Sequence, residues 1–303
     1  MRVLLTGAAG FVGSRVARVL LAQGHEVHAV VRRTHPSPRL RDVTGIRLLC
    51  GDVVDEIDIR ELVARTAPET CIHCAWVATP GEYLTSPDNA VHETAAEHLG
   101  RALIENGCGR IVGLGTCFEY APSDVPHDEM SLLGPSTVYA RAKLAAYERL
   151  ARVCEGTQTS LAWARLFHLF GPHEDPRRLV PSVTLALLDG RAAATTAGEQ
   201  LRDFFHVDDV ATALVTIAES RVSGPVNVAS GRPVRVRDVV HHIGRLTGRH
   251  DLLKLGALTY AAGDPMVVTA DVAKLAACGF ASRRTLEEGL AETVRWWSGR
   301  SRT

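Results

Sequence analysis

Residues Gly7–Gly13 constrain the fold of this chain more than any other part of its sequence. They read Gly-Ala-Ala-Gly-Phe-Val-Gly, follow the short apolar run Arg2–Thr6 and open the segment Phe11–Gln23, whose apolar residues recur at helical spacing. Glycine permits the tight turn and close backbone approach by which a pyrophosphate reaches a helix N-terminus. A strand, this loop and a helix in that order predict a dinucleotide site, with contacts at Gly7, Gly10, Phe11, Val12 and Gly13.

Strand-like and helix-like segments alternate through the first half of the chain. We expect strands near 2–6, 26–31, 47–50, 71–75, 110–114 and 160–166, and helices near 11–23, 56–65, 88–105 and 137–153. This order is typical of a parallel sheet covered on both faces, which binds ligands at the carboxyl ends of its strands. The predicted fold class is α/β, with a Rossmann-type doubly wound parallel sheet.

The pattern changes after Gly171. Prolines 172, 176 and 181 interrupt the next stretch, and short helices and brief strands follow. We expect a smaller mixed C-terminal substrate domain, with the apolar segment 225–229 returning to the main sheet. The predicted boundaries are 1–171 plus about 204–230 for the dinucleotide-binding domain, and about 172–203 plus 231–303 for the substrate-binding domain.

Tyr139 and Lys143 stand four residues apart in the sequence Tyr-Ala-Arg-Ala-Lys. The chain has five tyrosines and only three lysines among 303 residues, so a chance pair at this spacing is expected about 0.05 times. Four residues make about one helical turn, so the ammonium would lie beside the phenol and favour its ionised form. The pair predicts a proton donor to a carbonyl group.

The residues after the second predicted strand indicate which dinucleotide binds. An NAD site places a carboxylate there for the adenosine ribose, whereas an NADP site lacks it and supplies arginine to the 2′-phosphate. This chain has Val31 at that position, followed by Arg32 and Arg33. We therefore expect NADP(H) as the preferred cofactor, with NAD(H) as an alternative. The arginines can also be interpreted as a solvated basic loop that includes Arg39 and Arg41.

Composition limits the partners. The net formal charge is zero and the pI is about 7.2, so nothing indicates binding to nucleic acid or to an anionic membrane. No segment approaches the roughly 18 apolar residues of a membrane span, and the N-terminal run lacks the features of a signal peptide, so we expect a cytoplasmic protein. The seven cysteines are expected to be reduced. No metal is expected, because Cys71, His73 and Cys74 lack a second ligand pair at a recognised spacing.

Further segments match one family in order and spacing. They are Gly51-Asp52-Val53, Arg165–Pro172, Arg202–Asp209, Asn227–Gly231, Gly279-Phe280 and Leu286–Trp296. Together with the glycine loop, the Tyr139 and Lys143 pair, and Thr116 just past the fifth predicted strand, they run nearly from end to end. In these features the chain resembles the extended short-chain dehydrogenase/reductase family, which includes nucleotide-sugar epimerases, dehydratases and ketoreductases.

The resemblance implies roles for the matching residues. Thr116 corresponds to the family's catalytic serine or threonine, and Tyr139 would transfer the proton. Lys143 would bind the nicotinamide ribose and lower the pKa of the phenol. The remaining cofactor contacts would be Asp52 and Val53 at the adenine, Ala75 along the cofactor, and Phe167 beside the nicotinamide.

The implied substrate contacts are Thr116, Glu119, His168, Arg202 and Asp264. Arg202 matches an arginine that grips the diphosphate of a sugar nucleotide, but it could instead pair with Asp203 or Asp208. His168 stands where relatives often carry a substrate-facing asparagine, and simple packing among aromatic residues explains it equally well. For Glu119, contact with substrate and contact with solvent are equally compatible with the sequence.

Departures from the family pattern narrow the chemistry. Cys117 and Phe118 follow Thr116 where 4,6-dehydratases carry an acid pair, and Ala261-Ala262 replace an arginine usual in galactose-type epimerases. The resemblance thus implies NADPH-dependent reduction of a nucleoside-diphosphate 4-keto-6-deoxyhexose. The alternatives are a nucleotide-sugar 4-epimerase that retains NAD and, more remotely, a non-catalytic NADP-binding sensor or scaffold. A homodimer through the helices predicted near 88–105 and 137–153 is implied by the resemblance alone.

Overall fold

A parallel sheet forms the centre of the fold. The computed structural model describes residues 1–32 and 37–300, and within them seven strands lie in the order β10, β6, β5, β4, β1, β2, β3. Every neighbouring pair runs parallel. The strands are β1 Arg2–Thr6, β2 Glu26–Val31, β3 Arg47–Cys50, β4 Thr70–His73, β5 Arg110–Thr116, β6 Ser160–Leu166 and β10 Gly224–Val228. The predicted Rossmann-type doubly wound fold is confirmed.

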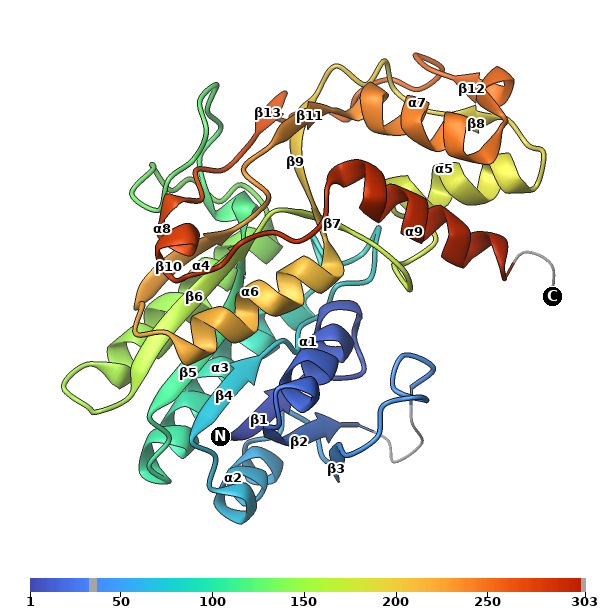
Figure 1. Ribbon diagram of the computed structural model, residues 1–303. Helices are drawn as coiled ribbons and strands as arrows, with labels where there is room; N and C mark the ends of the chain where they lie inside the picture. Colours follow the sequence, from blue (N-terminus) through green and yellow to red (C-terminus); the bar gives the residue numbers. More distant parts are fainter. Residues whose placement is uncertain (33–36, 301–303) are drawn as a thin grey trace.

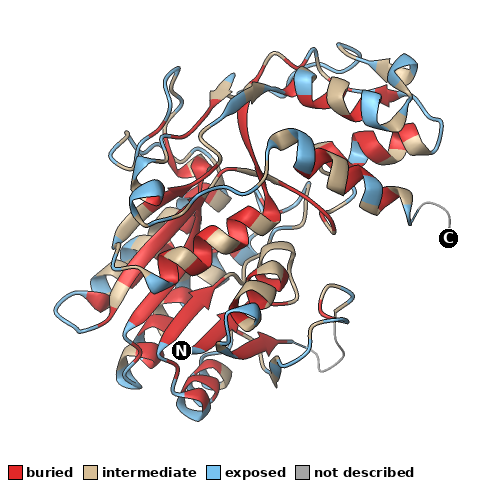
Figure 2. Cartoon of the chain, in the orientation of Figure 1, coloured by how far each residue is buried: buried red, intermediate tan, exposed pale blue. Residues whose placement is uncertain are grey.

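Two groups of helices cover the sheet (Figure 1). They are α1 Phe11–Ala22 and α6 Val207–Glu219 on one face, and α2 Glu56–Thr66, α3 Asp88–Glu105 and α4 Val138–Cys154 on the other. Because successive strand residues point to opposite faces, Val3 and Leu5 join the core under α1 and α6, while Leu4 joins the core under α2, α3 and α4. Figure 2 shows the strands buried between the two layers.

Capping side chains set where the helices begin. Asp55 accepts a hydrogen bond from the backbone N–H of Asp58 (3.0 Å) at the start of α2, and Thr137 accepts one from Ala140 (3.0 Å) at the start of α4. Such bonds satisfy N–H groups that have no partner in the first helical turn. The Thr137 cap therefore fixes Tyr139 in the first turn of α4.

Some element ends differ from those predicted. β5 continues to Thr116, so this threonine is the last residue of the strand. β4 ends at His73, which leaves Ala75 in the loop that follows. The segment expected to return near 225–229 forms β10 and pairs with β6, as predicted.

A smaller lobe follows β6 (Figure 1). Its strands are β7 His168–Phe170, β8 Ala193–Ala194, β9 Leu201–His206, β11 Pro233–Arg235, β12 Leu253–Lys254 and β13 Val267–Val268. Its helices are α5 Leu179–Leu188, α7 Val236–Thr247 and α9 Leu286–Ser298, with the short η2 His250–Leu252. Phe170, Val239, Ile243 and Leu290 lie in its separate core. α8 Ala273–Ala277 places Leu275 in the core of the large sheet instead. The domain boundaries stay a prediction.

Across the described part of the chain, no helix combines the length and the apolar character needed to cross a membrane.

Candidate active site

The glycine loop joins β1 to α1. Gly7 has a φ of 69°, a left-handed value that favours glycine. A Cβ atom at Gly13 would lie 2.2 Å from the Gly7 carbonyl oxygen, and one at Gly7 would lie 2.6 Å from the backbone nitrogen of Ala75. Gly10 precedes α1 and has no side chain to cap it. The first N–H groups of α1 are thus left to an anionic ligand, so the loop fits the pyrophosphate of a dinucleotide.

The last residue of β2 is Val31 rather than a carboxylate, and it is buried. Arg32, the next residue, is exposed, and Arg33 lies outside the described residues. Arg39 reaches back toward the glycine loop, where its Nη1 lies 3.5 Å from the carbonyl oxygen of Ala9. The loop after β2 therefore brings a second arginine, Arg39, to the edge of the glycine loop. From the sequence, Arg39 is interpreted only as part of a solvated basic loop.

The other predicted cofactor residues also follow strands of the sheet. Asp52 and Val53 follow β3 after Gly51, and Val53 is buried. The backbone N–H of Ala75 donates to the Thr6 hydroxyl (3.2 Å), which holds the segment after β4 against the end of β1. Phe167 is buried between β6 and β7. These positions agree with a site at the carboxyl ends of the strands, and their contacts with a cofactor stay a prediction.

Thr116 and Tyr139 meet between β5 and α4. Thr116 caps the short 3-10 helix η1 (Cys117–Glu119), and its hydroxyl accepts a hydrogen bond from the Phe118 N–H (3.3 Å). The same side chain acts on the phenol of Tyr139 and lowers the pKa of that phenol. A carbonyl oxygen placed against both hydroxyls would face two donors, an arrangement that can stabilise and protonate a developing alkoxide.

The pKa of Tyr139 is raised above its usual value. Burial is the largest cause, the neighbouring Tyr83 and Glu119 act in the same direction, and the Thr116 side chain opposes the rise. The sequence predicted that Lys143 would lower this pKa. Burial dominates the pKa of Tyr139, and the Lys143 Nζ lies 5.9 Å from the Tyr139 ring centroid, so the lowering by Lys143 stays a prediction. The phenol is therefore protonated at neutral pH and can act as an acid.

The ammonium of Lys143 is buried at the side of the sheet. Its Nζ donates to the carbonyl oxygen of Leu114 (2.8 Å) and lies 3.7 Å from the ring centroid of Trp76. Burial lowers the pKa of Lys143 to about 7, whereas the charges of Glu119 and Cys74 act in the opposite direction. The predicted bond from Lys143 to a ribose stays a prediction.

Glu119 is a buried structural residue, and its predicted contact with substrate or solvent is wrong. The side chain has no exposed surface. One carboxylate oxygen accepts from the Thr116 N–H (2.9 Å) and the Trp163 indole (3.0 Å), and the other accepts from Arg165 Nε (2.7 Å). Because both oxygens are already bonded, Glu119 holds Thr116 in place instead of binding a ligand directly.

Arg202 and Asp264, which are 62 residues apart, form an ion pair at 2.8 Å. Arg202 is almost fully buried, and Asp264 is partly exposed. The two alternative partners of Arg202 are bonded elsewhere: Asp203 accepts hydrogen bonds from the turn at 230–231, and Asp208 pairs with other arginines. The structure thus brings these two predicted substrate residues together, and their contact with a substrate stays a prediction.

His168 lies on β7 between two aromatic rings. Its ring is edge-on to Phe118 at 6.3 Å and lies 5.9 Å from Phe204. Burial lowers the pKa of His168 to about 3, and the positive charges of Arg202 and Arg178 act in the same direction. Its Nδ1 is buried and has no hydrogen-bond partner among the described residues. A neutral imidazole in this setting can bond to an uncharged hydroxyl group.

Three residues that the sequence did not single out contact this site. The Tyr83 ring is edge-on to Tyr139 at 4.9 Å, and the Arg178 guanidinium lies 5.0 Å from the centroid of Tyr83. Trp76 contacts Lys143, as described above. All three lie in loops, where hydrophobic periodicity gives no signal. The available signal was that Trp76, one of four tryptophans, directly follows the predicted cofactor residue Ala75.

One group of potential metal ligands occurs among the described residues, formed by His206, Asp208 and Glu292. The guanidinium of Arg284 donates to Asp208 (3.2 Å) and to Glu292 (3.1 Å). An arginine thus already supplies positive charge to these carboxylates, and we assign no metal to them.

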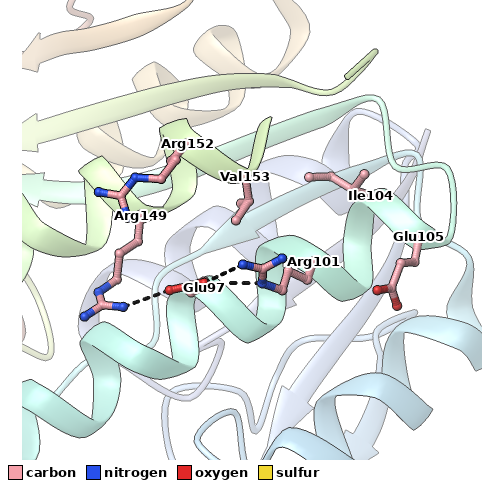
Figure 3. Close-up of a pocket in the computed structure, with 7 residues that line it drawn as sticks. All are labelled: Glu97, Arg101, Ile104, Glu105, Arg149, Arg152 and Val153. Atoms are coloured by element: carbon pink, nitrogen blue, oxygen red, sulfur yellow. Dashed lines mark hydrogen bonds and ion pairs between the residues drawn. The ribbon is translucent and has the colours of Figure 1, made fainter. Parts of the chain in front are cut away.

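A hollow on the outer surface of α3 and α4 shares no residue with the candidate site (Figure 3). It is lined by Glu97, Arg101, Ile104, Glu105, Arg149, Arg152 and Val153. Glu97 bonds to both Arg101 (2.8 Å) and Arg149 (2.8 Å) within the chain. These are the two helices through which the resemblance implied a homodimer, and that dimer stays a prediction.

Residues 3–229 match the NAD dependent epimerase/dehydratase family. The UDP-glucuronic acid decarboxylase 1 of Xenopus tropicalis is 28% identical over 98% of this chain and 72% of its own length. The dTDP-4-dehydro-6-deoxy-D-allose reductase of Streptomyces bikiniensis is 26% identical over 99% of this chain and 97% of its own.

The chain is also similar to an epimerase and to a protein whose solved structure contains NAD. The UDP-glucose 4-epimerase of Bacillus subtilis (strain 168) is 27% identical over 98% of this chain and 97% of its own length. The solved structure of MoeE5 in complex with UDP-glucose and NAD is 30% identical, covers 100% of both chains and superposes with a TM-score of 0.84.

Proposed function

The chain belongs to the NAD dependent epimerase/dehydratase family, and on that premise we propose that it is an NADPH-dependent reductase of a nucleoside-diphosphate 4-keto-6-deoxyhexose. At the coarser level it is a nucleotide-sugar-modifying enzyme with a pyridine nucleotide cofactor. The assignment of net reduction, of NADPH and of the keto sugar belongs to the proposal. The reductase of Streptomyces bikiniensis, similar over almost its whole length, supports it.

The residues of the site suit this chemistry. When bound, the nicotinamide supplies a hydride to the sugar carbonyl carbon. Tyr139 donates a proton to the carbonyl oxygen, and the raised pKa of its phenol keeps that proton available at neutral pH. Thr116 donates a hydrogen bond to the same oxygen as negative charge develops. Arg202 offers its guanidinium to the diphosphate.

The observation that carries the proposal is the end of β2. Val31 leaves no carboxylate to bind the hydroxyls of an adenosine ribose, while Arg32 is exposed and Arg39 approaches the glycine loop. Arginine beside this position favours a 2′-phosphate. A net reductase uses NADPH as its reductant, whereas an epimerase returns the hydride that it removes. A preference for NADPH therefore favours net reduction over epimerisation.

The proposal is tested by incubating the protein with NADPH and a panel of nucleotide 4-keto sugars while the nicotinamide absorbance is followed. We expect absorbance to fall only with a 4-keto-6-deoxy substrate, and Tyr139→Phe to serve as the control that abolishes turnover. Absence of NADPH consumption with every keto sugar, together with interconversion of two non-keto sugar nucleotides, would exclude the proposed reduction.

A nucleotide-sugar 4-epimerase that retains NAD is the second candidate. Two findings favour it, namely the similarity to the Bacillus subtilis epimerase and to MoeE5, whose structure contains UDP-glucose and NAD. An epimerase must return the hydride that it removes, so it gains by keeping one cofactor bound. Release of NAD by denaturing the freshly purified protein, in near-equimolar amount, would favour this candidate.

A further inference from the structure

Trp76 occupies an unusual position beside the lysine of the site. Its ring centroid lies 3.7 Å from the Lys143 Nζ, well within the distance at which a cation interacts with an aromatic face. The Tyr139 and Trp163 rings are more distant, at 5.9 and 6.0 Å. Trp76 is therefore the aromatic ring in closest contact with this ammonium among the residues that the structure describes.

Two residues of α3 hold the indole of Trp76 in place. Its Nε1 donates to the Asn89 Oδ1 (2.8 Å), and the ring stacks on His92 with centroids 5.2 Å apart. Asn89 is fully buried, and its amide also donates to the carbonyl oxygen of Tyr83 (2.7 Å). Both Asn89 and His92 belong to α3, whereas Lys143 belongs to α4. Trp76 thus bridges the two helices at a fixed orientation.

Few of the charged and titratable groups around Lys143 stabilise its protonated form. Burial disfavours its ammonium, and Glu119 and Cys74 are the groups that favour it. Glu119 is already engaged by Arg165. Burial raises the pKa of Cys74 to about 12, so that thiol is uncharged at neutral pH.

The remaining neighbours do not offset the burial. His73 and His92 have pKa values lowered to about 3 and about 4, first by burial and then by the charge of Lys143, so they are neutral near pH 7. Tyr139 is a protonated phenol, because its pKa is raised. The Leu114 carbonyl accepts one of the three ammonium hydrogens.

We propose that Trp76 is a positioning residue of this site, whose indole face holds the Lys143 side chain in its protonated form next to Leu114 and Tyr139. The electron-rich face of an indole attracts an ammonium but not a neutral amine, so it acts against the burial. With Lys143 protonated, the two ammonium hydrogens that Leu114 does not accept stay available to a ribose, and the site keeps a positive charge near the phenol. This last step rests on the proposed function, whereas the contact between indole and ammonium does not.

The test follows Lys143 directly by NMR, because the chain has only three lysines, at positions 143, 254 and 274. Protein labelled with 13C at lysine Cε is titrated, and Lys143→Arg assigns the signal by removing it. Trp76→Phe and Trp76→Leu are compared, since both lose the N–H donor to Asn89 and only the leucine also loses the aromatic face. Trp296→Leu, which removes an indole that packs against His173, is the control.

We expect the pKa of Lys143 to be lower in Trp76→Leu than in the wild type by about 1, with Trp76→Phe between them. The signals of Lys254 and Lys274, and all signals in Trp296→Leu, should titrate as in the wild type. Equal Lys143 titration in Trp76→Phe, Trp76→Leu and the wild type would overturn the inference. Trp76→Met provides a second aliphatic variant if the leucine variant does not fold by circular dichroism.

A second readout links the inference to the cofactor. The pH at which NADPH affinity falls, measured by calorimetry, should move to lower pH in Trp76→Leu by the same amount as the Lys143 titration, since the protonated lysine is the binding form. If the NMR shift occurs but the wild-type protein reduces no nucleotide keto sugar, the proposed function fails and the role of Trp76 stands. An unchanged pH dependence of binding in Trp76→Leu counts against the role of Trp76.

Discussion

The Tyr139 hydroxyl is the single group on which the proposed chemistry depends most. Tyr139→Phe removes the proton donor, but it keeps the ring that packs edge-on against Tyr83. We expect the rate of sugar reduction to fall by a factor of about 100 to 10,000, the usual contribution of general acid catalysis. Calorimetry should show an NADPH affinity within about threefold of that of the wild type. A threefold change in affinity is smaller than the tenfold change that corresponds to about 1.4 kcal/mol.

Lys143→Ala provides the contrast, because it should weaken both turnover and NADPH binding. Full activity of Tyr139→Phe would require another proton donor, and Tyr83, whose ring packs edge-on against Tyr139, would then be a phenol to examine.

Glu119 shows how far the role of a residue can be predicted from its type and its spacing from a motif. The sequence correctly marked the neighbourhood of Thr116, but a glutamate three residues after a threonine is both a plausible ligand and the second half of a capping box. The structure contains that capping box. Its other partner, Arg165, comes from a different strand 46 residues later, and no local pattern predicts which of two buried charges will pair. The fold, and not the motif, makes Glu119 structural.

The buried pair of Glu119 and Arg165 should therefore act as a unit in stability. Their side chains are 0% and 1% exposed, with 2.7 Å between Glu119 Oε2 and Arg165 Nε. Glu119→Gln leaves the guanidinium buried without its counter-charge, so we expect the free energy of unfolding to fall by about 3 to 5 kcal/mol in urea titrations. Asp189→Asn, which breaks an exposed pair with Arg191, should cost less than about 1 kcal/mol.

A double variant, Glu119→Gln with Arg165→Met, separates pairing from packing. We expect it to be less destabilised than the sum of the two single variants by about 1 to 3 kcal/mol. Strict additivity would show that the two side chains do not interact across the sheet.

At the scale of elements, the strands and helices with regular apolar spacing were predictable, whereas the loops that complete the site were not. The order of strands and helices through β6 follows from hydrophobic periodicity and from the glycine loop. The loop between β4 and α3 has no such period, and it is held by Asn89, whose side chain bonds to Trp76, Tyr83 and Ser86. Such a network depends on tertiary packing, so Trp76 and Tyr83 could not be placed from the sequence.

The segment after β2 should decide between the two nicotinamide cofactors. An arginine contact with a partly desolvated 2′-phosphate favours NADPH over NADH by about 1 to 3 kcal/mol, or roughly 5-fold to 150-fold in affinity. Arg32→Ala should remove most of this preference when both dissociation constants are measured by calorimetry. Arg41→Ala, another exposed arginine of the same segment, is the matched control and should keep it. Equal affinities for NADH and NADPH in the wild type would contradict the assignment.

β4 contains a buried histidine that should make stability depend on pH. Burial lowers the pKa of His73 to about 3, and the ring bonds to the Thr6 hydroxyl (2.8 Å). Between pH 6.5 and 3 the unfolded chain therefore takes up a proton that the folded chain does not. The free energy of unfolding should fall as the pH falls, by about 1.4 kcal/mol per pH unit for this residue.

Urea titrations at pH 6, 5 and 4 measure this slope. His73→Gln has no titratable ring, so its slope should be smaller than that of the wild type by about 1.4 kcal/mol per pH unit. His250→Gln, at an exposed position, is the control. A slope unchanged by His73→Gln would show that other groups account for the acid sensitivity.

For the whole molecule, the candidate site is assembled from both lobes. The large sheet and its helices supply the glycine loop, Thr116, and the α4 residues Tyr139 and Lys143. The smaller sheet supplies Arg202 on β9, and Asp264 lies shortly before β13. The charge of Arg202 also acts on Cys117, in the short helix η1 that follows β5 of the large sheet, and on His168 of β7. This arrangement suits a substrate whose diphosphate is held by one lobe while its sugar lies against the cofactor of the other.

The flow of hydride through the whole enzyme distinguishes reduction from epimerisation. A net reductase must release oxidised cofactor after each turnover, so we expect the protein to purify with little bound nucleotide and to consume one NADPH for each sugar reduced. With NADPH deuterated at the transferable position of the nicotinamide, chromatography and mass spectrometry should find one deuterium in each molecule of product. Tyr139→Phe, tested in parallel, should transfer label at a rate lower by about 100-fold or more. Formation of a 4-epimer from a non-keto sugar nucleotide, with no deuterium in the product and no loss of added NADPH, would replace the reductase with a retained-cofactor epimerase, since the hydride would then return to the carbon from which it came.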